Sequence, residues 1–98
     1  MIRSQSAGGR TSVAPEGNVG TQEAEQLAKA MEDAIAQGDE VAVDLSACQA
    51  LSSSAIGAMI ACHNALRAKG SRLRVHGTGE EILRLLRIMQ LDRHFDMA

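Results

Sequence analysis

The stretch "EVAVDLSACQALSSSAIGAM", residues 40–59, joins a short apolar strand to an amphipathic helix through a run of three serines. Its first part, "EVAVDL", is β-branched and mostly apolar, which is typical of a strand covered on at least part of both faces. From Ile56 onward, apolar residues such as Met59 and Ile60 recur at helical spacing. One serine is enough to cap a helix, so the run raises the question of whether another serine is used for chemistry.

Helices and strands alternate along the rest of the chain. Residues 21–38 have the apolar spacing of an amphipathic helix, and Thr21 is its expected N-cap. Residues 71–77, "SRLRVHG", alternate in the manner of a strand. Residues 78–90 predict a third helix, which Thr78 is expected to cap. The final "HFDM" is expected to add a short strand.

The first twenty residues predict a weak N-terminal hairpin, with "AGG" at its turn and its second strand ending near Pro15. Strands that alternate with helices need crossover connections, so the sheet should be largely parallel. We therefore expect an α/β fold, with a single mixed, mostly parallel β-sheet and helices packed mainly on one face. Residues 1–98 are long enough for one domain with one core.

Composition argues against several classes of function. The chain has one Phe and no Tyr or Trp, so it offers no platform on which nucleic-acid bases could stack. Its net charge is −2, and Lys and Arg are scattered among Asp and Glu, so no basic stripe is expected to bind nucleic acid. No apolar run is long enough for membrane insertion. Cys48 and Cys62 show no CxxC spacing, which predicts free thiols in a reducing compartment and a cytoplasmic protein.

No motif in the chain predicts catalysis, a metal or a cofactor. No G-x-S-x-G elbow surrounds a serine, and no His and Asp are placed to form a relay with one. His63, His76 and His94 lack the spacing of metal ligands, so we expect no metal site and no bound cofactor. We therefore expect a protein that is not an enzyme, in preference to a small hydrolase or a nucleotide-binding enzyme.

The serine run follows a strand and begins a helix, which is where α/β sheets place their binding sites. The first N–H groups of a helix lack partners within the helix and carry partial positive charge. A serine hydroxyl can satisfy these donors, and a phosphate on the same serine would satisfy them better. The run therefore predicts either an N-cap alone or an acceptor of phosphate. Asp44, at the end of the preceding strand, is expected to brace the loop or to orient a hydroxyl.

The chain from "VAVDLS" to "RHFDM" resembles a STAS domain, the module of anti-sigma factor antagonists and of sulfate transporter tails. In those antagonists, a strand ending in Asp-Leu/Phe-Ser precedes a loop and a motif of the form Asp-Ser-Ser/Thr-Gly-Leu-Gly. Here "VDLS" matches the first part, and "SSSAIG" takes the place of the second. A helix, a Gly, a strand and a leucine-rich helix follow in the family's order. The resemblance implies the family's α/β fold. We expect this chain to lack the helix with which the family's fold ends.

The resemblance also assigns roles at the start of the helix. The family's phosphorylated serine falls on Ser53, and its following Ser or Thr falls on Ser54. Ser52 stands in place of the family's acidic residue, Ala55 replaces the first glycine, and Gly57 matches the second. The methyl group of Ala55 is expected where the partner's loop approaches.

The resemblance implies an anti-sigma factor antagonist-like module that binds a serine-kinase anti-sigma factor. Phosphorylation at Ser53, in preference to Ser52 or Ser54, would switch it off, and a PP2C-type phosphatase would reset it. The domain would be a monomer or a weak dimer. The residues expected to bind the partner are Ser52, Ser53, Ser54, Ala55, Ile56, Met59 and Asp44. The alternative is a non-phosphorylated STAS adaptor subunit of a transporter or signalling complex, in which the serines only cap and pack.

Overall fold

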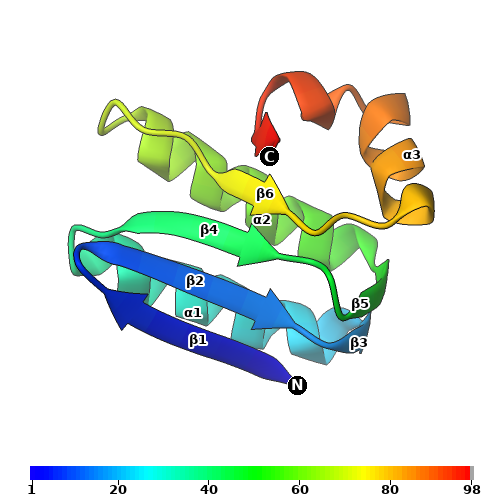
Figure 1. Ribbon diagram of the computed structural model, residues 1–98, viewed down its shortest axis with the longest axis horizontal. Helices are drawn as coiled ribbons and strands as arrows, with labels where there is room; N and C mark the ends of the chain where they lie inside the picture. The colour runs from blue at the N-terminus through cyan, green and yellow to red at the C-terminus, as the bar shows by residue number, and fades with distance from the viewer. Residues whose placement is uncertain (98) are drawn as a thin grey trace.

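The computed structural model describes residues 1–97, in which strands and helices alternate along most of the chain (Figure 1). The strands are β1 (Ile2–Ala7), β2 (Arg10–Pro15), β3 (Gly17–Val19), β4 (Glu40–Asp44), β5 (Cys48–Leu51), β6 (Arg74–His76) and β7 (Asp96–Met97). The helices are α1 (Thr21–Ala36), α2 (Ser53–Arg67), α3 (Glu80–Ile88) and the 3₁₀ helix η1 (Leu91–Arg93). Over this described part, no helix is long and apolar enough to cross a membrane.

Within residues 1–97, five strands form one sheet in the order β1-β2-β4-β6-β7. β1 and β2 are antiparallel and turn at Gly8 and Gly9, whose φ angles of 60° and 79° favour glycine. The other neighbours in this sheet are parallel. α1 and α2 lie side by side against one face and leave the other face open (Figure 1). The predicted fold class, a mostly parallel mixed sheet with helices mainly on one face, is confirmed.

β3 and β5 form a small second sheet, which the sequence pattern does not predict. The pattern indicates a loop because both strands are short, one begins with a glycine, and each depends on pairing with a segment distant in sequence. Their parallel pairing brings the carboxyl ends of both strands together, so α1 and α2 begin next to each other. The N–H of Ser52 donates a hydrogen bond to the carbonyl oxygen of Val19 at 2.9 Å, which connects the residue before α2 to the end of β3.

The core lies between the helices and the five-stranded sheet. Val43 of β4 and Val75 of β6 are paired in register, and neither has exposed surface. Phe95, the single aromatic residue of the chain, is 2% exposed and belongs to the same buried cluster. Cys48 and Cys62 are free thiols and both are buried. Burial raises the pKa of Cys62 to about 12, so this thiol stays protonated and packs as a small apolar group.

Two helices begin one residue away from the predicted cap. α1 follows Gly20, whose N–H donates to Oε1 of Glu23 at 3.2 Å, so Thr21 lies inside the helix. α3 follows Gly79, and the hydroxyl of Thr78 is buried without a hydrogen-bond partner among the described residues. The predicted caps Thr21 and Thr78 are therefore wrong. In each case a neighbouring glycine takes the extended backbone of the cap position.

The core predicts unequal effects for two apolar truncations in α3. Leu86 has no exposed surface, whereas Ile88 is 72% exposed. We expect Leu86→Ala to lower the free energy of unfolding by about 2–5 kcal/mol, because it removes buried apolar atoms and leaves a cavity. Ile88→Ala is the matched control and should change this free energy by less than about 0.5 kcal/mol. Urea denaturation measures both, and equal losses would show that α3 packs differently.

Candidate functional site

The three serines occupy different positions at the start of α2. Ser52 is the N-cap, with an extended backbone, and its Oγ accepts a hydrogen bond from the N–H of Ala55 at 3.1 Å. Ser53 and Ser54 are the first two residues of the helix, and both are exposed. The capping role therefore belongs to Ser52 alone, and the other two serines are exposed.

The N-terminus of α2 lacks the acidic residues that accompany the starts of the other helices. α1 has Glu23 in its first turn, and α3 has Glu80 and Glu81, but α2 has none. The partial positive charge of the first N–H groups is therefore not offset by an acidic side chain in this turn. An anion carried by the exposed Ser53 would lie next to these donors and would be stabilised by them.

Ser54 differs from Ser53 in its surroundings. It lines a hollow of about 320 Å³ between the starts of α1 and α2, and Glu25 lines the same hollow. A phosphate on Ser54 would therefore approach a carboxylate of like charge, whereas Ser53 does not line this hollow. The geometry favours Ser53 over Ser54 as the place for added negative charge.

Three residues that we expected to bind a partner lie in the core. Ala55, Ile56 and Met59 are 0%, 4% and 0% exposed. Their side chains form the buried face of α2 and cannot contact a docked protein, so this part of the prediction is wrong. The methyl group of Ala55 likewise packs inside and does not meet a partner's loop. The surface of α2 near the serines consists instead of Gly57 and Ala61, which are exposed.

Asp44 braces the loop that follows β4. Its Oδ1 accepts hydrogen bonds from the hydroxyl of Ser46 at 2.7 Å and from the N–H of Ser46 at 2.9 Å. The hydrogen bond from the hydroxyl of Ser46 lowers the pKa of Asp44 most, and the bond from the N–H of Ser46 lowers it further. Nδ1 of His76 lies 3.9 Å from the same oxygen. A Cβ at Gly77, whose φ is 70°, would come within 2.6 Å of this oxygen. Among the described residues, Asp44 bonds to none of the serines at the start of α2.

His63 lies on the buried side of α2, with 4% of its surface exposed. Its Nδ1 accepts a hydrogen bond from the N–H of Leu73 at 3.3 Å. Burial lowers the pKa of His63 below the ordinary value of 6.5, and the charges of Arg67 and Arg72 lower it further. The imidazole is therefore neutral at pH 7. It packs edge-on against Phe95, with ring centroids 5.3 Å apart. No cluster of His, Cys, Asp or Glu in residues 1–97 is arranged to hold a metal ion.

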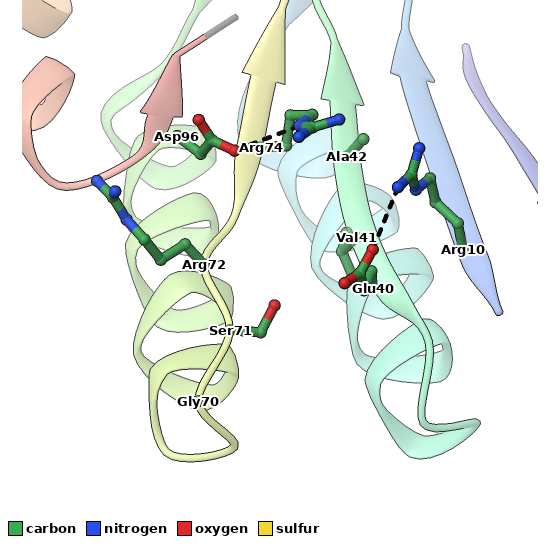
Figure 2. Close-up of a pocket in the computed structure, with 9 residues that line it drawn as sticks. All are labelled: Arg10, Glu40, Val41, Ala42, Gly70, Ser71, Arg72, Arg74 and Asp96. Carbon is green, nitrogen blue, oxygen red and sulfur yellow. Dashed lines mark hydrogen bonds and ion pairs between the residues drawn. The ribbon is translucent and has the colours of Figure 1, made fainter.

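The open face of the five-stranded sheet carries a separate hollow of about 240 Å³ (Figure 2). Arg10 pairs with Glu40 at 3.3 Å, and Arg74 pairs with Asp96 at 3.3 Å. Figure 2 shows each pair joining side chains of neighbouring strands. Both arginines thus have an opposing charge beside them, and exposed pairs of this kind contribute little energy. We interpret this face as a solvated surface.

Comparison with known proteins identifies relatives of this architecture. A family model described as "Mlab, STAS domain" matches residues 2–97. Among solved structures, the anti-sigma factor antagonist SpoIIAA in its unphosphorylated form is similar with a TM-score of 0.83 and 14% identity. That match covers 100% of this chain and 87% of SpoIIAA. Among curated proteins, no sequence matches this chain.

Two further structures show the same fold. The phosphorylated form of SpoIIAA from Bacillus matches with a TM-score of 0.81 and 15% identity, over 100% of this chain and 91% of its own. An anti-sigma factor antagonist from Mycobacterium paratuberculosis matches with a TM-score of 0.87 and 22% identity, over 99% of this chain and 83% of its own. At these identities the likeness establishes the fold.

The capping geometry predicts that the three serines contribute unequally to stability. We expect Ser52→Ala to lower the free energy of unfolding by about 0.5–2 kcal/mol, because the N–H of Ala55 loses its partner. Ser53→Ala and Ser54→Ala should each change it by less than about 0.5 kcal/mol. Ser52→Asp, which restores an N-cap, should recover most of the loss. Urea denaturation of the four variants measures these free energies. A loss in Ser53→Ala as large as that in Ser52→Ala would contradict the assignment of Ser52 as the N-cap.

The buried neutral state of His63 predicts a pH dependence of stability. Because the pKa of His63 is lower in the folded chain, the unfolded chain binds more protons at this residue as the pH falls below about 6.5, so the free energy of unfolding falls with the pH. His63→Asn cannot titrate, and it should remove a slope of up to about 1.4 kcal/mol per pH unit. Urea denaturation of both proteins between pH 7 and pH 5 measures the slopes. A variant that keeps the wild-type slope would exclude His63 as its source.

Proposed function

The chain belongs to the STAS domain family, and on this premise we propose that it is a partner-switching module controlled at Ser53. In its unphosphorylated form it binds a serine-kinase anti-sigma factor through the start of α2. The kinase, with its own ATP and Mg²⁺, phosphorylates Ser53 and is released. A PP2C-type phosphatase removes the phosphate and resets the module. The domain is the substrate of these enzymes and has no catalytic role of its own.

This proposal rests on one observation: at the start of α2, one serine caps the helix and a different serine is exposed. Ser52 supplies the N-cap that the family's acidic residue would supply at the same position. Ser53 is therefore not needed for the cap, and its hydroxyl is exposed where a kinase can reach it. The absence of acidic residues from the first turn of α2 leaves the positive end of the helix available to a phosphate.

Phosphorylation would change the surface without refolding the domain. It adds a charge of roughly −1.5 to −2 and three strong acceptor oxygens. The N–H groups at the start of α2 would hold these oxygens, so the helix would be kept. SpoIIAA has been solved in both forms, and this chain matches the two with TM-scores of 0.83 and 0.81. A partner seated over Ser53 would have to bury this charge without a cation of its own to pair with it, which weakens a complex by about 2–5 kcal/mol.

Small side chains surround Ser53 on the exposed side of α2 and suit close approach by a partner. Gly57 lies one turn beyond Ser53, and Ala61 lies one further turn along the same face. The hollow between α1 and α2 begins beside Ser54 and includes Ala58. We propose that the partner covers this face and not the buried residues of α2.

The test is phosphorylation of the purified domain by a partner-switching kinase from the same organism, with ATP and Mg²⁺. We expect mass spectrometry to find one phosphate, on Ser53, and none in Ser53→Ala. Ser54→Ala is the matched control and should accept phosphate as the wild type does. Binding to the kinase should be at least about 30-fold weaker for the phosphorylated domain, as the cost of burying its charge requires. Phosphate on another residue, or equal binding by both forms, would refute the switch.

A second candidate function is a constitutive adaptor subunit of a transporter or signalling complex. It is favoured by the fact that Ser52 already caps α2 without any modification. In that case neither Ser53→Ala nor phosphate at Ser53 would change affinity for the partner. Ala61→Arg would instead abolish binding by placing a bulky charge on the exposed face of α2. Pull-down from the native organism with the two variants separates the two functions.

A further inference from the structure

A pocket of about 350 Å³ lies beside the second half of α2, between this helix and η1. One part of its lining is apolar and comes from Ile60, Leu91 and Phe95. The other part is polar and includes His63 and Arg67. An apolar wall with a few convergent polar groups is the usual composition of a site for a small organic molecule.

His63 lines this pocket and carries a donor without a partner among the described residues. Because its Nδ1 accepts the N–H of Leu73, the proton of the neutral ring is on Nε2. Nε2 is buried and has no hydrogen-bond partner among the described residues. A buried donor without an acceptor is uncommon and costly, so a ligand atom that reached it and accepted its proton in a hydrogen bond would relieve that cost.

The pocket is also positively charged. Asn64 and His94 complete its lining, which contains no acidic residue. An adjoining hollow shares Arg67 and His94 and adds Arg72 and Arg93, again without an acidic residue. Arg72 is engaged with the backbone, since its guanidinium donates to the carbonyl oxygens of residues 93–95.

Arg67 and Arg93 differ from the arginines on the open face of the sheet. Over residues 1–97, neither takes part in an ion pair. The acidic side chains nearest to Arg93 in sequence are Asp92, which lines neither hollow, and Asp96, which pairs with Arg74. The charge at the mouth of the pocket is therefore available to an anion.

We infer that this pocket binds a small carboxylic acid carried on an apolar group. The carboxylate pairs with Arg67 and accepts the proton of Nε2 of His63 in a hydrogen bond. The apolar part lies against Ile60, Leu91 and Phe95. The occupant is a small molecule and not a protein segment, because the polar groups converge within a single hollow of the size of small-molecule sites.

This site is independent of the switch at Ser53. His63 follows Ser53 by ten positions on α2, which corresponds to roughly 15 Å along the helix axis. The two sites share no residue. A ligand in the pocket and a protein at the start of α2 can therefore be bound together, and neither proposal depends on the other.

The test uses 4-phenylbutyrate and its neutral amide as probes of the ¹⁵N-labelled full chain in nuclear magnetic resonance titrations. We expect 4-phenylbutyrate to cause a saturable shift of the Nε2–H signal of His63, and the amide to bind at least 10-fold more weakly. Arg67→Gln should weaken binding of the acid at least 10-fold. Arg84→Gln is the matched control, since Arg84 is exposed on α3 and does not line the pocket.

Three kinds of outcome would overturn the proposal. The first is the absence of a saturable shift at His63 up to millimolar probe. The second is equal affinity for the acid and the amide, or an affinity that Arg67→Gln leaves unchanged. The third is binding of a glutamate-containing peptide in this pocket without binding of the free acid, which would make the occupant a protein segment. None of these results bears on phosphorylation of Ser53.

Discussion

The parallel pairing of β3 with β5 is the interaction on which the rest of the site depends. The N–H of Gly17 donates to the carbonyl oxygen of Ala47, and the N–H of Ser52 donates to that of Val19, each at 2.9 Å. These bonds tie the start of α2 to the start of α1. Without them, the chain between β4 and α2 would be a free loop, and nothing would determine which serine begins the helix. With them, Ser52 is held at the cap and the next serine faces solvent.

Helical periodicity then divides α2 into faces with different roles. Ser53, Gly57 and Ala61 are four residues apart, so they share one face, and all three are exposed. Ile56 and Met59 are three residues apart on the opposite side and are buried between helix and sheet. The exposed face therefore carries the proposed partner surface, whereas the buried face holds the fold together. A single helix can serve both purposes because its two faces do not share side chains.

The arrangement of charges distinguishes the surfaces of the domain. On the open face of the sheet, arginines of β2 and β6 are paired with acidic residues of the neighbouring strands, as Figure 2 shows. The first turn of α2 contains no acidic residue, and the lining of the pocket beside its second half contains none either. Uncompensated charge next to an apolar surface favours an anionic ligand, whereas paired charge on a solvated face does not. Both proposals made for this domain concern regions of the first kind.

The sequence by itself determined the elements whose signal is local. The apolar period of α1, α2 and α3 and the β-branched run of β4 are readable because each depends on neighbours within a few residues. The alternation of these elements was enough to predict a mostly parallel sheet. Tertiary structure alone decided the pairing of β3 with β5, since each strand is too short to be stable without a partner distant in sequence. It also decided that Ala55 and Met59 face the core, because burial depends on what a helix packs against, whereas sequence spacing only shows which residues share a face.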